Sequence, residues 1–99
     1  MDDPIRVGRE ALERHAWTEA FDALQAADRI RPLQGEDLER LAEAAFFAPH
    51  PEVVLEAKER AFRAYEAAGD TERAAFLAIN IGVIAWCFRI TRRGLDAAR

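Results

Sequence analysis

Residues 8–32 read GREALERHAWTEAFDALQAADRIRP, and residues 42–66, which lie 34 positions further on, read AEAAFFAPHPEVVLEAKERAFRAYE. In both stretches apolar residues recur three and four positions apart, which is the spacing of one face of an α-helix. Each stretch is interrupted once, at His15-Ala16-Trp17 and at Pro49-His50-Pro51. Each therefore predicts two helices joined by a short turn, and the pair predicts an all-α fold built from helical hairpins.

The 34-residue shift also aligns small residues. It places small or apolar residues on each other at five pairs of positions: Val7 and Leu41, Gly8 and Ala42, Ala11 and Ala45, Ala20 and Val54, Ala27 and Ala61. The two helices of a hairpin approach closely where side chains are small. We therefore expect Gly8 or Ala42 to face Ala20 or Val54 within each hairpin, and Ala27 or Ala61 to make room for the next hairpin.

Signals for helix ends lie outside these two stretches as well. Asp3 followed by Pro4 predicts a capped helix start, because proline is favoured at the first helical position. Gly69 fits a left-handed C-terminal cap, and Asp70 fits the N-cap of a fifth helix over about residues 71–90. That helix is apolar nearly all round, so it must be covered on both sides. Residues 91–99 are a poor cover, which favours a further helix or a partner chain.

With Pro32 closing the first unit, the spacing resembles the tetratricopeptide repeat, a 34-residue helical hairpin. The first unit resembles its pattern at Gly8, Ala20, Leu24, Ala27 and Pro32, but departs from it at Pro4 and Ala11, where large aromatic residues are usual. The second departs from it, because Lys58 stands where a large apolar residue is usual and Glu66 where proline is usual. An ordinary Ala-rich antiparallel bundle is the alternative.

The resemblance implies one domain over residues 1–99, a right-handed array of stacked antiparallel hairpins. It would contain hairpins 4–31 and 36–68 and a partial third hairpin 71–99, hence about five helices plus a short C-terminal helix. The segments AAFF (44–47), LEAKERAFRAY (55–65) and AAGD (67–70) are similar to the helical repeats of LuxR-type bacterial transcriptional regulators. This implies a non-enzymatic protein–protein interaction module belonging or related to a bacterial regulatory protein, with no DNA-binding domain of its own in these 99 residues.

Composition excludes several classes of protein. Of the 99 residues 21 are Ala and none is Ser, and one Cys permits no disulfide framework. Residues 1–70 carry 16 acidic and nine basic side chains, which argues against nucleic-acid binding. The start Met-Asp-Asp-Pro predicts no signal peptide, and the apolar run 74–88 is shorter than a membrane span, so we expect a cytoplasmic protein without a membrane partner.

Side chains that could carry chemistry are few. His15 and His50 fall at turns without other ligands at metal-binding spacing, and we expect no metal or cofactor. Cys87, between Trp86 and Phe88, is expected to be a small buried apolar residue. An acidic stripe on the third helix could serve acid–base chemistry in a small enzyme or ligand-binding protein, but we expect it to be a solvated helix face, because such stripes are common on exposed helices. Its members are Glu36, Asp37, Glu39 and Glu43.

The resemblance implies that the first helix of each hairpin lines a groove for a peptide or helix. The candidate groove residues are Ile5, Arg9, Leu12, Glu39, Glu43, Phe46 and Phe47, continued by Ile79, Val83 and Trp86. Apolar residues flanked by Glu favour a partner with apolar and basic residues. Arg9 and Glu43 do not reproduce the Lys/Asn clamp with which some family members hold a C-terminal carboxylate. Ordinary core packing remains an alternative for the aromatic residues.

Self-association is the other function that the sequence favours. The fifth helix would leave an apolar patch at Phe76, Ile79, Val83 and Trp86, beside Cys87. Apolar patches of this size commonly mark interfaces. A two-fold dimer through helix 71–90 would bury the patch without any peptide groove, so a homo-oligomer is expected.

Overall fold

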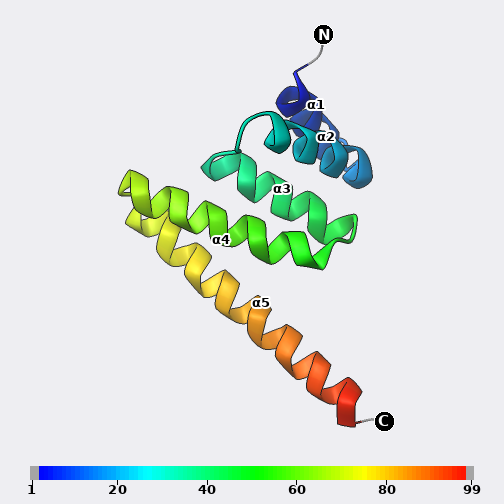
Figure 1. Ribbon diagram of the computed structural model, residues 1–99, viewed down its shortest axis with the longest axis vertical. Helices are drawn as coiled ribbons and strands as arrows, with labels where there is room; N and C mark the ends of the chain where they lie inside the picture. Colours follow the sequence, from blue (N-terminus) through cyan, green and yellow to red (C-terminus); the bar gives the residue numbers. More distant parts are fainter. Residues whose placement is uncertain (1–2, 98–99) are drawn as a thin grey trace.

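The computed structural model describes the backbone of residues 3–97 and the side chains of residues 3–87 and Arg89. Within that part the chain is all-α, as predicted, with stacked helices and no strand (Figure 1). The helices are α1 (Pro4–Glu13), α2 (Trp17–Ile30), α3 (Gly35–Phe47), α4 (Pro51–Ala68) and α5 (Thr71–Ala97).

The predicted helix ends are confirmed by local hydrogen bonds. The Ile5 amide donates to Asp3 Oδ1 at 3.1 Å, which caps α1 ahead of Pro4. Gly69 ends α4 at φ 79°, in the left-handed region that glycine enters without steric cost. The Arg73 amide donates to Asp70 Oδ1 at 3.2 Å and so caps α5. Each cap satisfies a backbone group that a helix end leaves unpaired.

The core lies where the two hairpins meet. α1 packs on α2, α3 packs on α4, and α2 packs on α3, so the first four helices form two stacked pairs. The buried residues are mostly small: Ala11, Ala20, Phe21, Leu24, Ala27, Leu33, Leu38, Leu41, Ala42, Ala44, Ala45, Val54, Ala57, Ala61, Tyr65, Ala74 and Leu77. Gly8 is buried too, but its nearest neighbour is Leu24, because a Cβ built on Gly8 would lie 2.6 Å from Leu24 Cγ.

Ion pairs connect helices that are distant in the sequence. Arg60 of α4 donates two hydrogen bonds of 2.8 Å to the Asp28 carboxylate of α2, and the Leu33 amide donates to the same carboxylate at 2.9 Å. The hydrogen bonds from Arg60 lower the pKa of Asp28, and that from Leu33 adds to the effect. Asp28 therefore connects two helices and the α2–α3 loop.

The last helix differs from the prediction. A short additional helix after residue 90 was expected, but α5 continues unbroken to Ala97, since no proline interrupts it and a helix tolerates its isolated glycines, Gly82 and Gly94. The third hairpin is thus represented by α5 alone over the described residues. α5 packs on α4 and diverges from the other helices toward its C-terminal end (Figure 1). Only Ala74 and Leu77 of its described side chains are buried.

None of these helices, over the residues described, combines the length and the apolar character that a membrane span requires.

Candidate functional site

A hollow opens between α3 and α5, with α4 as its floor. It has two adjoining parts of about 450 and 300 Å³. The hollow exists because α5 diverges from the bundle and packs on α4 without packing on α3. We call it the α3–α5 groove and define it by Glu39, Ala42, Glu43, Phe46, Phe47, Pro49, Pro51, Val54, Lys58, Asn80, Val83, Ile84 and Cys87.

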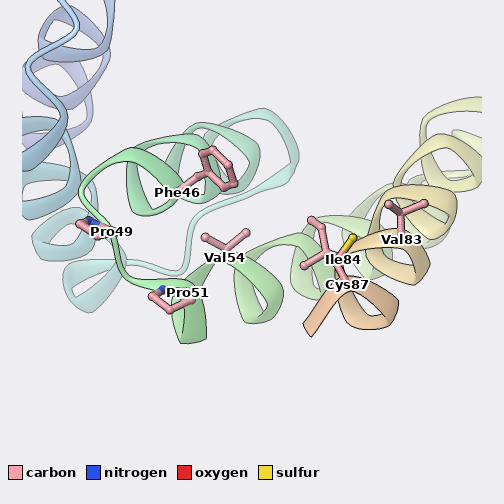
Figure 2. A pocket seen from close by; sticks show the side chains of 7 residues that line it. All are labelled: Phe46, Pro49, Pro51, Val54, Val83, Ile84 and Cys87. Atoms are coloured by element: carbon pink, nitrogen blue, oxygen red, sulfur yellow. The ribbon is translucent and has the colours of Figure 1, made fainter. Parts of the chain in front are cut away.

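One end of the groove is apolar. Figure 2 shows its lining side chains, which come from α3 at Phe46, from α4 at Val54 and from α5 at Val83, Ile84 and Cys87. Two prolines, at the end of α3 and the start of α4, complete this lining. Proline is unfavourable inside a helix but acceptable in its first turn, so Pro49 lies in the break after α3 and Pro51 begins α4.

Of the two adjacent phenylalanines, Phe47 is held by face-to-face stacking, whereas Phe46 makes an edge-to-face contact with Phe47. The Phe47 ring stacks on Trp17 at 4.3 Å between centroids, and Trp17 stacks on His15 at 5.0 Å. Phe46 meets Phe47 edge-to-face at 5.1 Å and is 63% exposed. Both rings are too exposed for ordinary core packing. Phe46 therefore exposes most of its ring to solvent beside the stacked Phe47.

The other end of the groove is polar. Lys58 Nζ donates to the Asn80 side-chain oxygen at 3.3 Å across the floor. Glu39 accepts a hydrogen bond from the Tyr65 hydroxyl, and the pKa of Tyr65 is raised, first by burial and then by this bond to a carboxylate. Glu43 is exposed and has no ion-pair partner among the described residues. This end thus has one acidic side chain available to an incoming cation.

The acidic stripe on α3 is not the uniformly solvated face that was expected. Glu36 pairs with Arg73 at 2.8 Å, and that hydrogen bond lowers the pKa of Glu36. Asp37 accepts from Arg9 and Arg40 at 2.8 Å each. Burial alone would raise the pKa of Asp37, but these hydrogen bonds outweigh it and lower the pKa. With Glu39, which accepts from Tyr65 of α4, three of the four carboxylates therefore connect α3 to another helix.

The predicted groove residues separate into three groups. Of those on α5, Val83 lines the groove, whereas Ile79 and Trp86 are not among its lining residues. Glu39, Glu43, Phe46 and Phe47 lie together along the α3 wall. Those of α1 lie elsewhere: Ile5 and Leu12 are partly buried against the core, and Arg9 is held by Asp37 through hydrogen bonds of 2.8 and 2.9 Å. None of these three residues is among those that line the α3–α5 groove.

The predicted self-association residues form an exposed stripe on α5. Phe76, Ile79, Val83 and Trp86 are all more than half exposed. Val83, at 54% exposure, also lines the groove, so the stripe and the groove form one continuous apolar surface. Cys87 was expected to be buried; that expectation is wrong, because α5 beyond Leu77 is covered on one side at most.

Sequence reasoning missed part of the lining. The predicted groove residues did not include Ala42, Pro49, Pro51, Val54, Lys58, Asn80, Ile84 or Cys87. Of these, Asn80, Ile84 and Cys87 lie three or four positions apart and share one face of α5, a spacing that the sequence does show. No group of His, Cys, Asp and Glu in the described part of the chain could hold a metal ion. His15 and His50 lie at turns, as predicted, and His50 stacks on Phe21 at 4.0 Å.

Comparison of this chain with family models, curated proteins and solved structures gives no match.

Proposed function

We propose that this domain is a non-enzymatic protein–protein interaction module of tetratricopeptide type that takes its partner in the α3–α5 groove. One observation carries the proposal: an apolar hollow between two helices is open to solvent and is walled by exposed aromatic and aliphatic side chains. Helix-in-groove recognition uses surfaces of this kind, with apolar anchors spaced along one face of the partner helix.

The groove also indicates the chemistry of the partner. Its apolar end requires aliphatic or aromatic anchors, and Phe46 is a suitable contact because partly exposed aromatic rings supply much of the binding energy at interfaces. At its polar end Glu43 favours a Lys or Arg on the incoming segment, while Lys58 is already bonded to Asn80. The partner is therefore a helix with apolar residues on one face and basic residues beside them.

The cellular context follows from the resemblance alone. Similarity of residues 44–70 to the repeats of LuxR-type regulators supports a place within, or beside, a bacterial regulatory protein in the cytoplasm. In such a protein the domain would hold a regulatory partner and would contact no nucleic acid itself.

A defined probe tests the proposal. A synthetic amphipathic helix with leucines on one face and lysines beside them is titrated into the isotope-labelled protein, and backbone NMR shifts are followed. We expect saturable binding, with shifts concentrated at Phe46, Val54 and Val83. Phe46→Ser should weaken binding at least about tenfold, as expected of a central anchor. Glu43→Lys should weaken it about five- to tenfold through charge repulsion.

The matched controls separate the effect of a charge change in the groove from the effect of the same charge change elsewhere. Glu59→Lys makes the same charge change on the exposed face of α4, outside the groove, and should leave affinity unchanged. A probe with glutamates in place of lysines should bind more weakly than the basic one. Shifts centred on α1 and α2, or equal affinity for the two probes, would refute the proposed groove and its charge preference.

A further inference from the structure

The C-terminal half of α5 has the composition that the α3–α5 groove requires of a partner. Residues 81–97 read IGVIAWCFRITRRGLDA: they are rich in aliphatic and aromatic residues and carry Arg89, Arg92 and Arg93 against Asp96. The first 70 residues, which supply the α3 and α4 sides of the groove, carry 16 acidic side chains against nine basic ones. An apolar, basic helix and an apolar groove with an acidic rim therefore occur in the same chain.

That helix segment cannot be the occupant of the groove of its own chain, because its residues Val83, Ile84 and Cys87 already line one side of it. α5 is one continuous helix of 27 residues, about 40 Å long. Its first turns are anchored on α4 by Ala74 and Leu77, and its far end leads away from the other helices (Figure 1). The occupant must come from another molecule.

We propose that the occupant is α5 of a second copy of this chain, and that two copies exchange the C-terminal halves of α5 across a two-fold axis. The inference rests on the proposed function, since it names the partner helix of the same groove. In a two-fold arrangement each copy gives one helix and receives one, so both grooves are filled and both exposed stripes are covered. Val83 lies at the centre of this contact because it belongs to both surfaces.

The exposed area is adequate for such a dimer. Phe46, Phe47, Phe76 and Trp86 are each more than half exposed. At roughly 200 Å² for each aromatic side chain, they alone expose on the order of 500 Å². A stable dimer needs about 800 Å² per partner. Ile79, Val83 and the groove floor supply the remainder.

Two exposed charged side chains, Glu43 and Arg89, determine how the exchanged helix lies in the groove. Glu43 stands at the rim of the groove without an ion-pair partner among the described residues, and Arg89 is exposed on α5. With α5 of one copy in the groove of the other, Arg89 of each copy lies beside Glu43 of the other. The two charges attract between copies and not within one.

A mixing experiment tests this arrangement with chains of all 99 residues. Wild-type protein should sediment at twice the 11.2 kDa chain mass at micromolar concentration. Glu43→Arg alone and Arg89→Glu alone should each weaken the homodimer about tenfold or more, because each creates two like-charge pairs. When the two variants are mixed, each pairing becomes Arg with Glu, so native mass spectrometry should show the heterodimer in excess of the statistical half.

The controls separate a groove contact from other dimers. Glu59→Arg mixed with Arg89→Glu should give no heterodimer excess, since Glu59 lies outside the groove. Val83→Glu should abolish the dimer, whereas Ala78→Glu, an exposed position away from the stripe on the same helix, should retain it. Far-UV circular dichroism confirms that each variant is folded.

The possible outcomes are distinct. A heterodimer excess that requires Glu43→Arg, together with loss of the dimer in Val83→Glu, supports the exchange. A monomeric wild-type chain at about 100 µM, or a dimer insensitive to Glu43→Arg, overturns it. In either of those cases the lysine-bearing model helix still tests the groove independently, so exchange can fail while the proposed function stands. If neither the dimer nor the helix binds, both proposals fail.

Discussion

Replacing Gly8 and Gly82, each inside a helix, with alanine tests how closely the helices of a hairpin pack. Gly8 lies inside α1 against α2, and Gly82 lies inside α5 on its open side. A Cβ on Gly8 would meet Leu24 Cγ at 2.6 Å and Cδ2 at 2.7 Å, whereas a Cβ on Gly82 meets nothing within 4 Å. Replacing either with alanine adds one methyl group and the same gain in helix propensity, so any difference between them reports the packing.

The magnitudes follow from this geometry. Gly82→Ala should raise the free energy of unfolding by about 0.5–1 kcal/mol, because alanine restricts the unfolded chain and favours helix. Gly8→Ala has the same favourable effect on helix propensity, but the added methyl group clashes with the fully buried Leu24. Either Leu24 must move or α1 must separate from α2. Overpacking of this kind costs about 1–3 kcal/mol, so a net loss of about 1–2 kcal/mol remains. For a chain of this size that lowers the melting temperature by roughly 5–15 °C.

Urea and thermal unfolding followed by circular dichroism measure both changes. In a Leu24→Ala background the clash is removed, so Gly8→Ala should then be neutral or stabilising although Leu24→Ala itself costs about 2–5 kcal/mol. If Gly8→Ala stabilised the wild-type chain as much as Gly82→Ala does, the close approach of α1 and α2 at Gly8 would be refuted.

Three further predictions concern stability. Asp28→Ala should cost about 2 kcal/mol in urea unfolding, because it removes three hydrogen bonds to a partly buried carboxylate, whereas Asp22→Ala on the exposed face of the same helix should stay within about 0.5 kcal/mol. The pKa values of Asp28, Glu36 and Asp37 are lowered in the folded state. These three carboxylates therefore stabilise the fold fully at a pH above their unfolded pKa values near 4, and this stabilisation is lost as the pH falls below those values. Urea unfolding midpoints should be flat from about pH 7 to 5 and should decline below about pH 4. Gly69→Ala should cost about 1 kcal/mol or more, because φ is 79° there, and Gly69→Asn should cost less in the same thermal melt.

Local signals in the sequence predicted most of the fold. Asp3, Gly69 and Asp70 act within a few residues of themselves, so their capping roles could be predicted without knowledge of the rest of the chain. Apolar spacing predicted the helices for the same reason. The close contact of Gly8 with Leu24 was not predicted, because a shift between repeats fixes which residues are small but not the rotation of one helix against another.

The site was harder to predict because it depends on how far α5 diverges from the other helices. Glu39, Glu43, Phe46 and Phe47 were placed in a groove from their register on one helix, and they do lie together. Arg9 was placed there by the same register, yet Asp37 on a neighbouring helix holds it, and nothing in the spacing of either residue indicates that pair. Cys87 was expected to be buried because an apolar neighbourhood in sequence suggests a core, whereas burial depends on what packs against that turn of the helix.

The part of α5 beyond Leu77 links the stability of this helix to the occupancy of the α3–α5 groove. The first turns of α5 are buried on α4 by Ala74 and Leu77, while the described side chains beyond Leu77 are exposed or half-buried. Helices in proteins draw most of their stability from packing an apolar face, so this half of α5 is the least supported of the described helical segments. An occupant of the groove that packs on Val83 and Ile84 covers that face and stabilises the helix by mass action, as any ligand of the native state does. Occupancy of the groove and stability of α5 therefore rise together, and a change at Val83 affects both at once.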